Sequence, residues 1–215
     1  MSMNGKRIII VTGGTLGDWA LGDIQSDDIL VGSDRGALYL IQHGYKPDIA
    51  MGDFDSVTED ELELIRASSH TFVDCDPIFK DLTDTEMAFN WALAQQPAHI
   101  TILGAIGTRF DHSLANVHLL RKGLEQGISC SIVDANNQII VIQQSTSITR
   151  GDYTHISLLP LSMEVTGITL HGFQYPLHNA TLQIGQSLGI SNVLAASQGM
   201  IELETGLLLV IQSKD

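Results

Sequence analysis

The feature that most constrains this fold is an alternation of short apolar runs with helical patterns over about the first 130 residues. Each run has the length and composition of a short buried strand. The runs cover residues 8–11, 29–32, 49–52, 71–73, 100–104 and 129–133. Apolar residues at helical spacing predict helices over 60–67, 83–94 and 113–126. Strands that alternate with helices form βαβ units, so we predict an α/β domain with a mostly parallel sheet and helices on both faces.

The pattern changes after Asp134, where helical periodicity is lost. Short strand-like runs then follow one another closely, with turn residues between them. They cover residues 138–142, 153–159, 164–169, 180–184, 200–204 and 207–212. We therefore predict an α/β domain over residues 1–134 and an all-β domain, a small sandwich, over residues 135–215.

The charge balance limits the classes of partner. The chain has 25 acidic and 11 basic side chains, for a formal net charge of −14. Such a chain repels nucleic acid and anionic lipid, and a phosphate-bearing substrate would need a divalent cation between itself and the protein. No run approaches the roughly 18 apolar residues of a membrane span. The two cysteines, Cys75 and Cys130, form no motif, which favours reduced thiols and a cytoplasmic location.

The segment PDIAMGDFDS, residues 47–56, has the pattern of a buried strand that ends in an acidic loop. Ligands of doubly wound sheets bind at the carboxyl ends of the strands, where this loop falls. Asp53 and Asp55 offer two carboxylates there, and Mg²⁺ usually takes one or two carboxylates. The alternative is a simple turn in which Asp53 and Ser56 bond nearby backbone amides.

The segment KDLTDTE, residues 80–86, has the spacing of a helix start. Thr83 and Glu86 fit a capping box, which explains both residues without any function. Asp84 falls in the first helical turn, from where it could reach a metal as a third carboxylate. Lys80 could contact phosphate or be an ordinary surface residue.

Glycines mark two turns that could approach an anion. The segment GAIGTRFDH, residues 104–112, joins a strand to a helix, and helix N-termini offer free amides to anions. Arg109 adds a planar cation suited to phosphate. The alternative is an ordinary connection with Asp111 as the N-cap. The glycines of residues 13–17 also follow a strand, but they lack the lysine of a P-loop, so a backbone turn and a nucleotide contact stay equally open.

Taken together and in this order, these segments resemble the thiamine pyrophosphokinase family. Residues 33–37, SDRGA, resemble the family's Ala-Asp-Gly-Gly-Ala stretch, and residues 189–192, GISN, add a weaker match near the C-terminus. The resemblance implies transfer of a pyrophosphoryl group from ATP to the hydroxyl of thiamine, giving thiamine diphosphate and AMP. It also implies Mg²⁺ as cofactor, ATP as co-substrate, and a homodimer in which thiamine lies where one subunit's α/β domain meets the other's β domain.

The resemblance also implies roles for individual residues. Asp53, Asp55 and Asp84 would be the catalytic carboxylates and magnesium ligands, with Asp34 as a further acidic contributor. The nucleotide and its phosphates would be held by Lys80, Asp81, Thr83, Thr108, Arg109, Asp111 and His112, and thiamine by Ser191 and Asn192. The chain departs from the family pattern at Arg35 and Leu38, where glycine and asparagine are usual, and at Val193, where an acidic residue is common.

Two other functions are compatible with parts of this pattern. A haloacid-dehalogenase-type phosphatase would use Asp53 as nucleophile, because Asp53, Asp55 and Val57 imitate its DxDxT/V motif. That interpretation leaves the segment 80–84 unexplained, and no later pair of aspartates follows a strand. A non-catalytic thiamine or nucleotide sensor would keep the fold without turnover, although it would have no need for three carboxylates around a metal.

Overall fold

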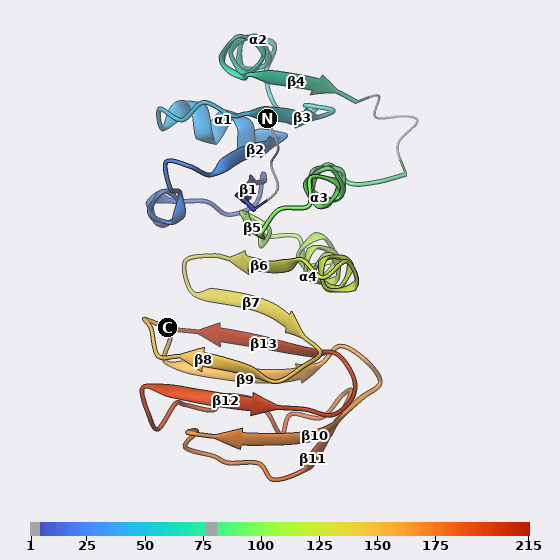
Figure 1. The fold of residues 1–215 in the computed structure, drawn as a ribbon. Helices are drawn as coiled ribbons and strands as arrows, with labels where there is room; N and C mark the ends of the chain where they lie inside the picture. The colour runs from blue at the N-terminus through green and yellow to red at the C-terminus, as the bar shows by residue number, and fades with distance from the viewer. Residues whose placement is uncertain (1–4, 76–80) are drawn as a thin grey trace. The chain divides into compact units, whose positions relative to one another are not determined.

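The apolar runs of the first part of the chain form a parallel β-sheet (Figure 1). The computed structural model describes residues 5–75 and 81–215. Within these residues, six strands of the first part follow the order β4-β3-β2-β1-β5-β6, and each neighbouring pair is parallel. They are β1 (Arg7–Val11), β2 (Ile29–Ser33), β3 (Ile49–Gly52), β4 (Thr71–Asp74), β5 (His99–Leu103) and β6 (Ser129–Val133). The predicted parallel sheet is therefore present.

Helices cover both faces of this sheet. They are the 3-10 helix η1 (Asp18–Asp23), α1 (Arg35–Gln42), α2 (Glu59–Ser68), α3 (Asp84–Ala94) and α4 (Phe110–Glu125). In Figure 1, η1 and α1 lie on one side of β1, and α3 and α4 lie on the other. Strand β1 is accordingly apolar on both faces, with Ile8, Ile9, Ile10 and Val11 fully buried. The prediction missed η1 and α1.

The helix starts follow ordinary capping chemistry. In α2, the Thr58 hydroxyl accepts from the amide of Glu61, and the Glu61 carboxylate accepts from the amide of Thr58, which is a complete capping box. In α3, the Thr83 hydroxyl accepts from the amide of Glu86, which is the N-cap half of the predicted capping box. The Glu86 carboxylate accepts from the ammonium group of Lys122 on α4, which joins the two helices.

The remainder of the chain, from Asn136 on, forms a second compact unit of antiparallel strands. In the described residues these make one sheet ordered β7-β13-β9 and another ordered β11-β10-β12-β8. The strands are β7 (Asn137–Ile142), β8 (Thr146–Thr149), β9 (His155–Pro160), β10 (Glu164–His171), β11 (Ala180–Gln183), β12 (Gln198–Glu202) and β13 (Leu208–Ser213). The division into an α/β part and an antiparallel β part matches the predicted fold class, whereas β8 was missed.

Alternating side chains of both sheets form one apolar core in this second unit. One sheet contributes Ile156, Leu158, Leu208 and Val210, and the other contributes Ile148, Val165, Ile168, Leu170, Leu182 and Ile201. The burial of β9 alternates strictly between buried and half-buried residues, as expected for a strand with one face on a core. Among the described residues, no helix has both the length and the apolar composition needed to cross a bilayer.

Candidate functional site

A pocket of about 360 Å³ lies at the carboxyl ends of the parallel strands. Strand β1 has β2 on one side and β5 on the other, so the chain leaves β1 in one direction and returns to its other edge later. Such a reversal opens a crevice between the loops that follow the two strands, and ligands of α/β sheets bind there. The pocket is lined by Thr12, Gly13, Gly14, Ser33, Asp34, Asp55, Thr83, Asp84, Thr85, Gly104, Ala105, Gly107, Thr108, Arg109, His112 and Asn116.

The loops after β1 and β5 lie directly against each other at the base of the pocket. The amide of Gly14 donates to the carbonyl of Gly104 over 2.9 Å, and the hydroxyl of Thr12 donates to the same oxygen over 2.6 Å. A Cβ at residue 14 would lie 2.1 Å from that carbonyl, so only glycine permits this approach. The glycine segment after the first strand thus has a structural reason; its contact with a nucleotide stays a prediction.

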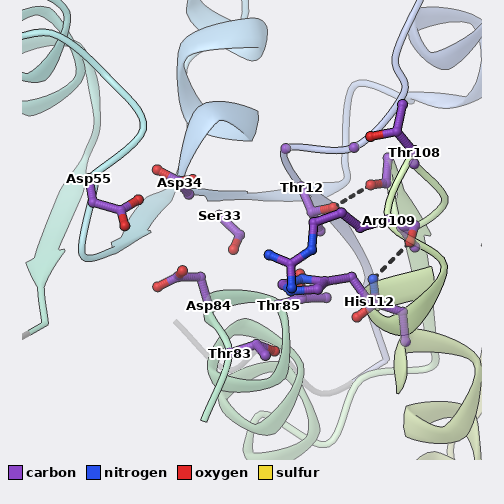
Figure 2. Close-up of a pocket in the computed structure, with 16 residues that line it drawn as sticks. Thr12, Ser33, Asp34, Asp55, Thr83, Asp84, Thr85, Thr108, Arg109 and His112 are labelled. Carbon is purple, nitrogen blue, oxygen red and sulfur yellow. Dashed lines mark hydrogen bonds between the residues drawn. The ribbon is translucent and has the colours of Figure 1, made fainter. Parts of the chain in front are cut away.

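Three carboxylates, those of Asp34, Asp55 and Asp84, lie on one side of the pocket (Figure 2). Oxygen atoms of Asp34, Asp53 and Asp55 lie within 4.8 Å of one another. The carboxylate of Asp84, at the start of α3, accepts from the amide of Asp53 over 3.2 Å. The resemblance implied Asp53, Asp55 and Asp84 as metal ligands and Asp34 as a further acidic contributor, and the structure brings these four carboxylates together.

The acidic loop is held in place by the residue between its two carboxylates. Phe54 is 4% exposed and stacks on Phe72 of β4, with ring centroids 4.9 Å apart. Its backbone has a φ of 52°, an unusual conformation for a residue with a side chain. With the aromatic ring anchored in the core, the flanking Asp53 and Asp55 are left outside it. The alternative interpretation is half confirmed, because the Asp53 carboxylate accepts from the nearby amide of Asp55 over 3.3 Å, whereas the Ser56 hydroxyl donates to the carboxylate of Asp34.

The carboxylates are arranged unfavourably for a protein without a bound cation. Burial raises the pKa of Asp34, and the charges of Asp84 and Asp55 raise it further, against the lowering effect of a hydrogen bond from the Ser56 hydroxyl. Among the described residues, Asp34 Oδ1 is buried without a hydrogen-bond partner. A cation would remove the repulsion and supply that oxygen with a ligand interaction, and an all-oxygen donor set suits Mg²⁺.

Arg109 approaches the pocket from the N-terminal end of α4 (Figure 2). It occupies the N-cap position, and its guanidinium pairs with the Asp111 carboxylate over 2.7 Å, with both side chains exposed. The hydrogen bond from Arg109 lowers the pKa of Asp111. Asp111 is therefore not the N-cap of this helix but lies in its first turn. An exposed pair of this kind is weak and can exchange one partner for another anion.

The structure brings most of the residues predicted for the nucleotide side together. Asp55, Thr83, Asp84, Thr108, Arg109 and His112 all line the pocket. Asp81 is exposed in the segment before α3, and Lys80 lies outside the described residues. The sequence interpretation missed Thr12, Ser33, Thr85 and Asn116. Thr12 and Ser33 were detectable, because each is the first polar residue at the end of a buried run.

The two residues predicted to bind thiamine belong to the second unit. Ser191 is exposed and has a φ of 57°, and its amide donates to the Ser157 hydroxyl. Asn192 is 5% exposed; its amide group donates to the carbonyl of Tyr175 over 2.7 Å, and its oxygen accepts from the amides of Tyr175 and Val193. These bonds fix the segment around Tyr175, so the Asn192 side chain braces the backbone here.

Comparison with known proteins gives the same assignment for both parts of the chain. The family model described as thiamin pyrophosphokinase, catalytic domain, matches residues 23–132, and the model described as thiamin pyrophosphokinase, vitamin B1 binding domain, matches residues 137–208. A thiamine pyrophosphokinase of Bacillus subtilis is 36% identical over 98% of this chain and 100% of its own length. The chain belongs to the thiamine pyrophosphokinase family. The haloacid-dehalogenase and sensor interpretations are not favoured.

Solved structures of thiamine pyrophosphokinases have the same fold. The crystal structure of the Bacillus subtilis thiamine pyrophosphokinase matches with a TM-score of 0.91 and covers 98% of this chain and 100% of its own. The yeast thiamin pyrophosphokinase is only 15% identical, yet its structure matches with a TM-score of 0.81 over 98% of this chain and 87% of its own. At that identity the likeness shows that the fold is shared.

Proposed function

We propose that this chain transfers the pyrophosphoryl group of ATP to the hydroxyl of thiamine, giving thiamine diphosphate and AMP. Membership of the thiamine pyrophosphokinase family supports the reaction and both substrates. The observation that carries the proposal is the cluster of Asp34, Asp53 and Asp55, with Asp84 bonded to it, beside a pocket that also holds Arg109. Anionic phosphates can enter so acidic a site only together with a cation.

The carboxylate cluster is the proposed magnesium site. Asp34, Asp53, Asp55 and Asp84 would hold the ion, and the unpartnered buried oxygen of Asp34 supports this choice. When bound, Mg²⁺ neutralises phosphate charge and screens the charge that develops on the departing AMP. The acidic loop, fixed by the buried ring of Phe54, would keep two of these carboxylates in place through the reaction.

The other side of the pocket is proposed to hold the phosphates. Arg109 would exchange its exposed pairing with Asp111 for a bidentate contact to a phosphate group. Thr83, Thr108 and His112 offer further polar groups from the same lining. Lys80 and Asp81 remain proposed nucleotide-binding residues from the sequence. In-line attack by the thiamine hydroxyl on the β-phosphorus then depends on how well these groups position the two substrates.

The second unit is proposed to bind thiamine. We assign the nucleotide- and magnesium-binding domain to residues 1–134 and the thiamine-binding domain, a small β-sandwich, to residues 135–215. Ser191 would contact thiamine directly, and Asn192 would contribute by holding the backbone around Tyr175. We further propose a cytoplasmic homodimer with its active site at the subunit interface. Light scattering on the purified protein tests the dimer, since a monomeric mass that retains full activity contradicts it.

The reaction is tested with purified protein, ATP, magnesium and thiamine. The expected result is AMP and thiamine diphosphate in equal amounts, with neither formed when thiamine or magnesium is left out. Formation of ADP would show transfer of a single phosphoryl group, and thiamine-independent release of orthophosphate would show a phosphatase. Either of these two products without AMP contradicts the proposal.

A further inference from the structure

Ser33 has a buried hydroxyl with an unused hydrogen-bonding capacity at the pocket. It is the last residue of β2, it is 1% exposed, and it lines the pocket. Among the described residues, its Oγ has no hydrogen-bond partner. Buried hydroxyls in folded proteins almost always have a partner, so this one requires an explanation.

The other buried polar side chains around the pocket do have partners. Thr12 donates to the carbonyl of Gly104, and Asn116 donates to the carbonyl of Ala105 over 2.8 Å. Ser113 accepts from the amide of Gly107 over 3.1 Å. These side chains fix the loops that form the pocket. Ser33 fixes nothing of this kind, so its hydroxyl is free to bind a molecule that enters.

The surroundings of Ser33 indicate what that molecule is. Figure 2 shows the Ser33 side chain between Asp34 and Asp84, within the lining of the same pocket. A hydroxyl donates one hydrogen bond, and the best acceptors are anionic oxygens. The carboxylates nearby are the proposed ligands of the cation, so the acceptor oxygens that a substrate brings to this point are those of phosphate groups.

We propose that Ser33 is a further substrate-binding residue, whose hydroxyl donates a hydrogen bond to a phosphate oxygen of the bound magnesium–nucleotide complex. This inference rests on the proposed function for the identity of the ligand, a magnesium-bound nucleotide. The hydroxyl is buried and held ready before the nucleotide arrives, so little side-chain freedom is lost on binding.

The first test compares Ser33→Ala with a matched control, Ser131→Ala. Ser131 is 2% exposed, and its hydroxyl is bonded to His99 and Thr101. We expect Ser33→Ala to lower kcat/KM for ATP at least tenfold through KM, with an unchanged melting temperature and an unchanged KM for thiamine. Ser131→Ala should lower the melting temperature and leave both KM values unchanged. A KM for ATP within twofold of the unsubstituted enzyme in Ser33→Ala overturns the proposal.

The second test measures binding without turnover, by calorimetry with magnesium and a non-hydrolysable ATP analogue, and with magnesium alone. Ser33→Ala should weaken binding of the analogue about tenfold and leave binding of magnesium alone unchanged. Equal affinity for the analogue, or an equal loss for magnesium alone, overturns the phosphate contact. Ser33→Cys has the same shape with a somewhat larger atom in place of the oxygen, and its thiol donates only weakly, so it should also weaken binding of the analogue. If the unsubstituted protein forms no AMP, the proposed reaction fails, while this binding comparison still decides the role of Ser33.

Discussion

Replacing Asp53 by asparagine tests two effects of the carboxylate cluster separately. One is the charge repulsion that destabilises the folded protein without magnesium, and the other is the binding of magnesium for the reaction. Oxygen atoms of Asp34 and Asp53 lie within 4.8 Å of each other. At that separation two unit charges repel by about 1 kcal/mol in a water-like medium and by about 3 kcal/mol at an effective dielectric constant of 20. Asparagine retains the side-chain oxygen that accepts from the amide of Asp55. We therefore expect Asp53→Asn to unfold, without magnesium, at an equal or higher denaturant concentration.

With magnesium present, the unsubstituted protein should become more stable than Asp53→Asn. An ion present at ten times its dissociation constant stabilises the folded protein by about 1.4 kcal/mol, and a variant that no longer binds it gains nothing. The ion's contribution to charge stabilisation is several kcal/mol, so AMP formation should fall by roughly a hundredfold or more.

Two measurements test this prediction. The first is denaturant unfolding with and without magnesium, and the second is the rate of AMP formation by the folded protein. Asp152→Asn removes an exposed carboxylate of the second unit and serves as the control, with no expected change in either measurement. A folded Asp53→Asn protein with full activity, or with an undiminished response to magnesium, refutes the assignment of the metal site.

Three further changes test other parts of the structure. Arg109→Ala should raise KM for ATP about tenfold or more, and Arg109→Lys should recover only part of the loss, because lysine cannot form the bidentate contact; equal kinetics for all three proteins would contradict the phosphate role. In a denaturant titration, Gly14→Ala should lower the free energy of unfolding by roughly 1–3 kcal/mol, because the added Cβ collides with the carbonyl of Gly104. Gly22→Ala is the control and should have little effect, because the space around its Cβ is open. Burial, followed by the charge of Arg7, lowers the pKa of His99, so below about pH 6.5 the unfolded chain binds a proton that the folded protein does not. Stability should therefore fall as the pH drops below about 6.5, and His99→Gln should make that fall shallower. An identical pH profile for the two proteins would contradict the neutral state of the half-buried His99 side chain.

The local sequence pattern was sufficient to predict those strands that consist of a short apolar run. The runs that became β1, β3 and β6 are mostly buried and can be recognised as strands without knowledge of their neighbours. Helix α1 was missed for a physical reason. It contains Gly36, which normally disfavours a helix, but a Cβ at that position would lie 1.9 Å from the carbonyl of Val11. The glycine is required by close packing of α1 on β1, a contact that no local pattern contains.

The same distinction holds in the second unit. Strand β8 covers only Thr146–Thr149 and buries Ile148. Its ladder is formed with β12, about fifty residues later in the chain. A four-residue segment with one buried side chain has too weak a local signal to be recognised as a strand. It is a strand because a distant segment supplies the hydrogen bonds.

By itself, the sequence determined the α/β-then-β order of the chain, the acidic loop with Asp53 and Asp55, and the family that these motifs resemble. Tertiary structure alone decided that the carboxylates of Asp34, Asp53 and Asp55 lie together and that Ser33 faces the pocket. The reason is geometric: the carboxyl ends of adjacent parallel strands meet at one edge of the sheet, so residues from separate loops become neighbours only when the strands pair. The charge repulsion, the buried unpartnered oxygens and the space for a nucleotide all arise from that pairing.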